Sequence, residues 1–213
     1  MKTASSSIEL NFANNFMEKS DVLSHMEEGI DLEQNNVGWF NPIPELMDGS
    51  YSLYNTAFQF YHKFKFGPHQ SARVIKNRIP NHIWNSYLKF TVERNPFDKM
   101  VSMYFMNWGK NGCNREGRSF EDWVKRGQNI PYNFPLYTWK GDVIVDRVLK
   151  YENIQQELSK LYKELGVPFQ SLEEKAKSTY RKKKDYKEVH SSYTKQWTES
   201  NFKNELDLLG YEY

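Results

Sequence analysis

The stretch that most constrains the fold is Tyr87–Trp108, YLKFTVERNPFDKMVSMYFMNW. Its first residues are aromatic and β-branched, which is typical of a mostly buried strand. Pro96 stops that strand and fits the first position of a helix, with Asn95 as the N-cap. Apolar residues then recur at helical spacing, which marks one buried face: Met100, Val101, Tyr104, Phe105 and Trp108. The stretch predicts a strand, a turn and a helix, one unit of an α/β fold.

Arg94 lies at the turn between this strand and this helix, and Ser102 lies in the second helical turn. Open α/β sheets bind ligands at such a position, where backbone N–H groups and the helix dipole favour an anion. An arginine, a helix N-terminus and a serine would together hold a phosphate. The alternative is that Arg94 pairs with Glu93 or Asp98 and that Ser102 is only a small helix residue. Chemistry alone leaves both interpretations open.

The first residues form a second candidate phosphate site. Lys2 precedes a run of small residues and then a helix: Thr3, Ala4, Ser5, Ser6 and Ser7. A loop of small residues can wrap a phosphate with its N–H groups while lysine supplies positive charge. The run is not a Walker A motif, which needs glycines at fixed positions. A frayed terminus is the alternative.

His69 precedes a predicted helix whose apolar face includes Ala72, Ile75 and Ile79. An imidazole titrates near pH 6.5 and can act as a general base. The alternative is a solvent-exposed or capping histidine. We interpret the remaining histidines as structural or surface residues: His25, His62, His82 and His190.

Composition excludes some classes of protein. The net charge of +2 is too small to indicate nucleic-acid binding. The basic run 175–187 is interpreted as a solvated face, with nucleic-acid binding as the sharper alternative, and no nucleic-acid-binding motif surrounds it. A single cysteine, Cys113, and the lack of an Asn-x-Ser/Thr sequon favour a reducing, cytoplasmic location. No apolar run has the length of a membrane span, and no metal-ligand cluster is visible.

The rest of the chain gives a coarser prediction. Loops are expected at Gly109–Arg118 and Pro131–Trp139, and a strand at Val143–Tyr151. Helices are expected from Ser119, from Glu152 to Gly166, and near the end of the chain.

The run FTVERNPFDKMVS resembles the 3′-phosphate-binding segment of PAPS-dependent sulfotransferases of the bacterial or carbohydrate type. The N-terminal KTASSS resembles their 5′-phosphosulfate loop, and the likeness is strongest at 1–10, 67–108 and 143–166. It implies a single α/β domain over residues 1–213, with a P-loop-like parallel sheet flanked by helices.

The resemblance also implies a reaction and its residues. The sulfuryl group of PAPS would pass to an acceptor hydroxyl, with a carbohydrate as one candidate acceptor, and no metal is implied. Arg94 and Ser102 would hold the 3′-phosphate, and Lys2 with Thr3, Ala4, Ser5, Ser6 and Ser7 the 5′-phosphosulfate. His69 would be the base. Lys2 would also neutralise charge on the bridging oxygen, and Arg181, in the basic run, would close over the nucleotide.

The chain departs from this family in one respect. Met1 stands where the family has a proline that ends a hydrophobic strand. We therefore expect a missing first strand, weak PAPS binding, and self-association through an open sheet edge. A catalytically silent protein that binds 3′,5′-ADP is the alternative. A nucleotide-dependent kinase fits less well, because Walker A glycines are lacking.

Overall fold

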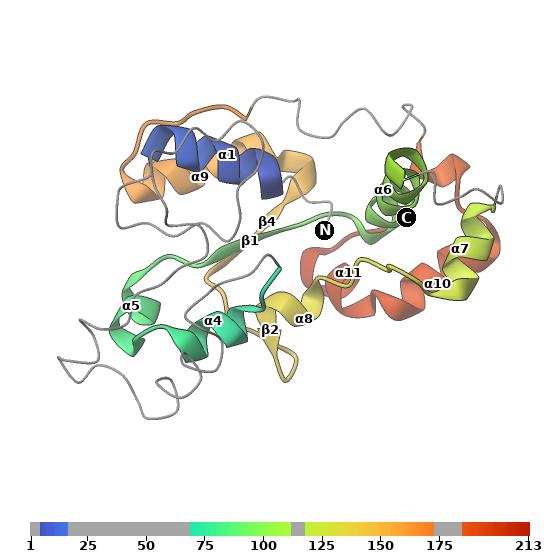
Figure 1. Ribbon diagram of the computed structural model, residues 1–213, viewed down its shortest axis with the longest axis horizontal. Helices are drawn as coiled ribbons and strands as arrows, with labels where there is room; N and C mark the ends of the chain where they lie inside the picture. Colours follow the sequence, from blue (N-terminus) through green and yellow to red (C-terminus); the bar gives the residue numbers. More distant parts are fainter. Residues whose placement is uncertain (1–4, 17–68, 112–117, 173–184) are drawn as a thin grey trace. The chain divides into compact units, whose positions relative to one another are not determined.

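The computed structural model describes residues 5–16, 69–111, 118–172 and 185–213 (Figure 1). The chain divides into two compact units, which we describe separately. Unit 1 comprises residues 1–7, 92–134 and 149–213, and unit 2 comprises residues 8–91 and 135–148. The elements in chain order are α1 (Ser5–Phe16), α4 (Ala72–Arg78), α5 (Asn81–Ser86), β1 (Phe90–Glu93), α6 (Pro96–Asn111), α7 (Phe120–Arg126), α8 (Phe134–Tyr137), β2 (Thr138–Trp139), β3 (Asp142–Val143), β4 (Arg147–Lys150), η1 (Tyr151–Asn153), α9 (Ile154–Leu165), η3 (Tyr186–Glu188), α10 (Ser192–Asn201) and α11 (Lys203–Leu209).

Strands β1 and β4 form a small parallel sheet. At one end the Lys89 N–H donates to Asp146 Oδ2 over 2.8 Å, and at the other the Asn95 N–H donates to Glu152 Oε1 over 2.8 Å. Both pairs are 57 residues apart in sequence. Along parallel strands the residue numbers of neighbours rise together, so their difference stays constant. The equal separation at the two ends therefore agrees with β1 and β4 running in the same direction. The α/β prediction is confirmed at this level.

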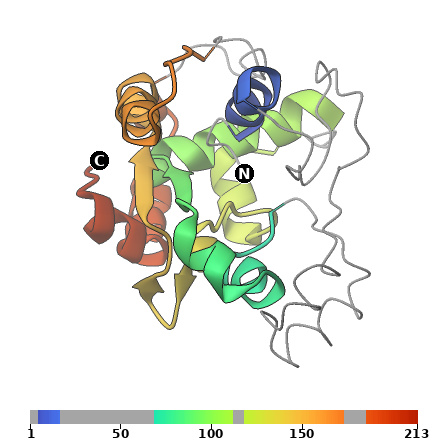
Figure 2. The same cartoon turned by 90° about the vertical axis from the view of Figure 1, so that its left-hand side faces the viewer.

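Each strand of this pair leads into a helix. β1 is followed by α6, and β4 is followed through η1 by α9. Figure 2 shows the arrow of β4 running into α9. The carboxyl ends of both strands therefore lead into helix N-termini.

Helix α6 begins at Pro96, as predicted, because Asn95 caps it. The Asn95 side-chain Oδ1 accepts the Phe97 N–H over 3.0 Å. The predicted loop from Gly109 is wrong at its start, since the helix continues to Asn111. A single glycine weakens a helix without ending it.

Strand β1 begins at Phe90, so the predicted strand start at Tyr87 is wrong. Tyr87 is 67% exposed, and its N–H donates to Ile83 O at the end of α5. An aromatic side chain has high strand propensity, but here the backbone belongs to a helix C-cap.

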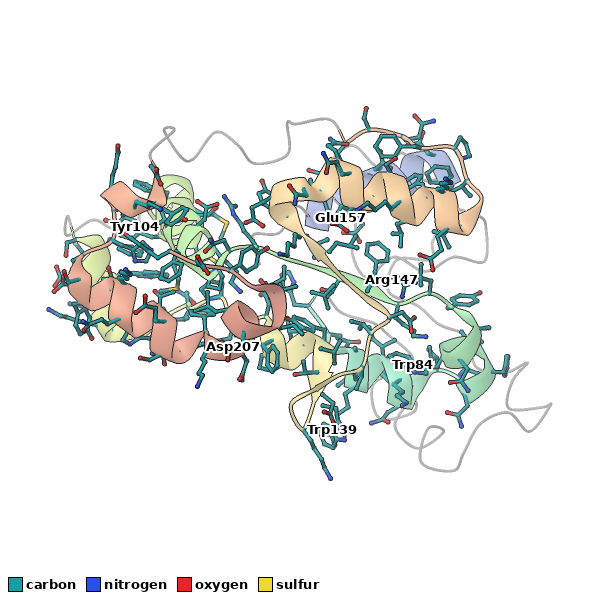
Figure 3. All side chains as sticks on the ribbon, turned by 180° about the vertical axis from the view of Figure 1, so that it is seen from behind. Trp84, Tyr104, Trp139, Arg147, Glu157 and Asp207 are labelled. Atoms are coloured by element: carbon teal, nitrogen blue, oxygen red, sulfur yellow. The ribbon has the colours of Figure 1, made fainter. Side chains whose placement is uncertain are left out.

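The core of unit 1 lies where α6, α7 and the segment joining α10 to α11 meet. Tyr104 contributes to it from α6 (Figure 3). Its ring contacts Phe120 edge to face at 5.4 Å between centroids, and its hydroxyl donates to Arg118 O. The buried members of this cluster are Met100, Val101, Tyr104, Phe120, Val124 and Phe202.

Unit 2 contains a short antiparallel hairpin, β2–β3, in which Thr138 is opposite Val143. Lys140 and Gly141 make its turn with positive φ values of 54° and 92°. Trp139 lies on this hairpin (Figure 3), and the Arg73 guanidinium of α4 lies 3.3 Å from the centroid of its ring. The guanidinium thus fixes the hairpin against α4 by a cation–π contact.

Two further predictions need correction. The segment Pro131–Trp139 contains α8 and β2 and is not an irregular loop. The predicted strand Val143–Tyr151 is interrupted, and only Arg147–Lys150 pairs with β1.

Three predicted helices are confirmed. α7 has a capping box in which Ser119 and Asp122 exchange hydrogen bonds. α9 ends at Gly166 in the left-handed conformation, with φ 69°, and α11 precedes the last residues. None of the helices in the described part of the chain is long and apolar enough to cross a bilayer.

Candidate anion-binding site

The structure brings together the two residues that the sequence selected in unit 1. Arg94 follows β1, and Ser102 lies on the second turn of α6. Arg94 Nη1 donates to Ser102 Oγ over 3.2 Å. A guanidinium and a hydroxyl are therefore in contact at the beginning of a 16-residue helix, where backbone N–H groups favour negative charge.

Asp98 pairs with Arg94, so the pairing that the alternative interpretation predicted is present. Arg94 Nε donates to Asp98 Oδ2 over 2.6 Å, and Arg94 Nη2 makes an ion pair with the same oxygen. The two side chains are 12% and 19% exposed. Asp98 holds the guanidinium in one orientation and at the same time neutralises part of its charge.

Two residues from the end of β4 complete the site. The Arg94 guanidinium carbon lies 4.4 Å from the centroid of the Tyr151 ring. Glu152 accepts the Asn95 N–H through Oε1, and the Tyr211 hydroxyl through Oε2 over 2.6 Å. We missed this contribution in the sequence. The signal was present, because two parallel strands that each end before a helix bring their following residues together.

Beneath Arg94 lies a cluster of buried charges, which the sequence did not predict. Glu93 and Lys99 are both 0% exposed, and Lys99 Nζ lies 2.8 Å from Glu93 Oε1. Asn133 Nδ2 donates to the same oxygen over 3.2 Å. Glu205 is also buried, and its pKa is raised above the ordinary value, first by desolvation and then by the nearby charge of Glu93.

His190 packs beside the start of α6. Its Nε2 lies 3.1 Å from Phe97 O, and its ring contacts Phe97, Phe120 and Tyr213 edge to face. Burial lowers the pKa of His190 below its ordinary value. These contacts agree with the interpretation of His190 as a structural residue.

The other predicted site residues are placed as follows. Lys2, Thr3, Ala4 and Arg181 lie outside the described residues. Ser5, Ser6 and Ser7 form the first turn of α1 and not a loop. Serine is compatible with a helix N-terminus, which also presents N–H groups to an anion.

His69 is exposed and has a left-handed backbone, with φ 60°, two residues before the Ser71 N-cap of α4. It belongs to unit 2, whereas Arg94 and Ser102 belong to unit 1. Histidine is among the residues that adopt a left-handed conformation more readily than most. Its side chain is thus at the surface of its own unit.

A search of the described residues for three or more His, Cys, Asp or Glu side chains that could hold a metal ion finds no such group.

Comparison with known proteins finds a relative in an archaeon. An uncharacterized protein of Archaeoglobus fulgidus is 37% identical to this chain over 102 residues. The matched residues are 46% of this chain and 82% of the archaeal protein. Neither a family model nor a solved structure matches the chain.

Proposed function

Since the chain belongs to the same family as this archaeal protein, whose name gives no activity, we propose a function from the chain's own residues: a PAPS-dependent sulfotransferase. It transfers the sulfuryl group of PAPS to an acceptor hydroxyl and releases 3′,5′-ADP. The proposal depends on one observation, the 3.2 Å contact between Arg94 and Ser102 at the start of α6. This contact is what a 3′-phosphate site requires, a charged donor and a hydroxyl beside helix N–H groups.

Other parts of the proposal follow the resemblance. The small parallel sheet of β1 and β4 belongs to a P-loop-like sheet. Lys2, Thr3, Ala4 and the first turn of α1 hold the 5′-phosphosulfate, and Arg181 closes over the nucleotide. His69 takes the proton from the acceptor hydroxyl as its oxygen attacks sulfur. The sulfur–oxygen bond to the 5′-phosphate breaks, and the electron pair leaves on 3′,5′-ADP, where Lys2 neutralises it.

The acceptor carries a hydroxyl, and carbohydrates are the first class to test. The cysteine and sequon evidence favours the cytoplasm as the place where the protein meets PAPS.

Calorimetry with 3′,5′-ADP and 5′-AMP tests the nucleotide site. Wild-type protein should prefer 3′,5′-ADP, because only that nucleotide has a 3′-phosphate for Arg94 and Ser102. Arg94→Ala should lose this preference, at a cost of about 1.5–3 kcal/mol for a charged hydrogen bond. Arg126→Ala is the matched control, since Arg126 is an exposed arginine in the last turn of α7. Equal affinity of the wild type for the two nucleotides would contradict the proposal.

Transfer from labelled PAPS to a panel of hydroxyl acceptors, carbohydrates included, tests the reaction. His69→Ala is the control that separates chemistry from binding, since it should keep the affinity for 3′,5′-ADP and lose transfer. Selective binding of 3′,5′-ADP without transfer to any acceptor would favour the catalytically silent alternative.

A further inference from the structure

Glu93 is the last residue of β1, and its buried carboxylate is next to the backbone of Arg94. Among the described residues its Oε1 accepts three hydrogen bonds. The donors are the Arg94 backbone N–H at 3.0 Å, Lys99 Nζ at 2.8 Å and Asn133 Nδ2 at 3.2 Å. The carboxylate therefore links the backbone of Arg94 to α6 and to the segment before α8.

This arrangement is costly as a source of stability alone. A buried ion pair loses the hydration of both charges, and replacing such a pair by apolar residues of similar size is often neutral or stabilising. Lys99 and Glu93 are both 0% exposed, and Lys99 also lies 4.9 Å from the centroid of the Phe202 ring. Leucine or methionine would fill this space at less cost.

Leucine or methionine in place of Glu93 would not accept the hydrogen bond that the Arg94 N–H donates. Arg94 lies between the end of β1 and the start of α6, and its backbone N–H donates to Glu93 Oε1 over 3.0 Å. This acceptor oxygen is fixed by Lys99 and Asn133. Asp98 and Ser102 orient the guanidinium at the other end of the Arg94 side chain.

We propose that Glu93 and Lys99 are positioning residues for the anion site: the buried pair fixes the backbone of Arg94 so that its guanidinium is preorganised for the 3′-phosphate. The proposal rests on the proposed function for the identity of the ligand. Glu93 and Lys99 do not themselves touch the nucleotide.

The decisive variant replaces both charges at once, Glu93→Met with Lys99→Met. It leaves no unpaired buried charge at the pair, but it removes the acceptor of the Arg94 N–H and of Asn133 Nδ2, so the melting temperature should fall moderately while the protein still folds. Affinity for 3′,5′-ADP should fall by about tenfold or more, because the arginine is no longer fixed. A pair that is only structural would leave the affinity unchanged, and that result overturns the proposal.

Two further variants complete the test. Lys99→Arg keeps a cation opposite Glu93 and should keep the affinity within about threefold of the wild type. The matched control is Glu121→Met with Lys125→Met, which removes from α7 a half-exposed ion pair of 2.7 Å and the hydrogen bond that Ser191 donates to Glu121. Its affinity should not change. A loss in the control as large as in the buried pair would overturn the proposal.

If the double variant does not fold, Glu93→Gln with Lys99→Met replaces it. Glutamine has nearly the same shape as glutamate and this variant leaves no lone buried charge, but Lys99 no longer fixes the side-chain oxygen at position 93, so affinity should fall by about threefold or more. Wild-type affinity in this glutamine variant would overturn the proposal.

Hydrogen exchange of the Arg94 amide, measured by NMR without nucleotide, separates this proposal from the proposed function. The amide should be protected in the wild type and exchange faster in the double methionine variant or in Glu93→Gln with Lys99→Met. If the wild type does not prefer 3′,5′-ADP, the proposed function fails and the exchange rate alone decides the positioning role. An Arg94 amide that exchanges equally in all these proteins overturns it.

Discussion

Burial shifts the pKa values of Glu205 and His190 in opposite directions, because in both cases it disfavours the charged form. The raised pKa of Glu205 means that the folded chain holds this proton more tightly than the unfolded chain. Its contribution to stability is complete below the ordinary value of 4.5 and is lost as pH rises through the folded pKa. The lowered pKa of His190 acts in the other direction. Its contribution is present above 6.5 and is lost as pH falls.

Glu205→Gln should remove the pH dependence of stability that Glu205 causes. The amide is neutral at every pH, so the variant should gain stability relative to the wild type as pH rises above 4.5. The slope of the difference is at most about 1.4 kcal/mol per pH unit for one proton. Urea unfolding at a series of pH values measures it, with exposed Glu199→Gln as the control. Parallel stability curves for wild type and Glu205→Gln would show that Glu205 carries no proton linked to folding.

The elements around Arg94 could be predicted because their signals are local. Pro96 and Asn95 fix the start of α6, and the short spacing between Arg94, just before α6, and Ser102, on its second turn, allows their contact. The two strands were predicted with the wrong limits, since strand ends depend on the partner strand and not on propensity. The Tyr87 side chain is of a type common in strands, but its backbone forms the C-cap of α5.

Helix α10 was missed for a different physical reason. Its buried positions include Thr194 and Thr198, which a search for apolar periodicity does not count. Their hydroxyls are satisfied by the backbone, as Thr198 Oγ1 donates to Thr194 O over 2.8 Å. Likewise, Tyr211 reaches the site through its hydrogen bond to Glu152, a tertiary contact for which the sequence gives no direct spacing.

Asn95→Ala tests the capping of α6 as an element. The variant removes the acceptor for the Phe97 N–H and should destabilise the protein by about 1 kcal/mol, the usual cost of losing an N-cap. Asn95→Asp keeps that acceptor and should lose less. Urea denaturation gives both values. An equal loss in the two variants would mean that the Asn95 Nδ2 bond to Glu212 O, and not the cap, carries the effect.

At the scale of the whole molecule, each unit is assembled from separate stretches of the chain. The chain crosses between units inside both paired strands, since Thr91 and Val148 belong to unit 2 and Val92 and Leu149 to unit 1. Neither unit can lose its structure without removing hydrogen-bonded residues from the β1–β4 pair. We therefore expect the two units to unfold together, as cooperative single domains do.

Native-state hydrogen exchange of Val124→Ala measures this coupling. Val124 is 1% exposed in the core of unit 1, and its truncation should cost about 2 kcal/mol through lost burial and the cavity left behind. If unfolding is cooperative, the slowest amides of α4 and α5 in unit 2 should accelerate as much as those of α7 and α10 in unit 1. Exposed Lys125→Ala, one residue away on α7, is the control and should change neither set. Acceleration confined to unit 1 would show that the strand pair does not transmit unfolding, and that each unit has its own stability.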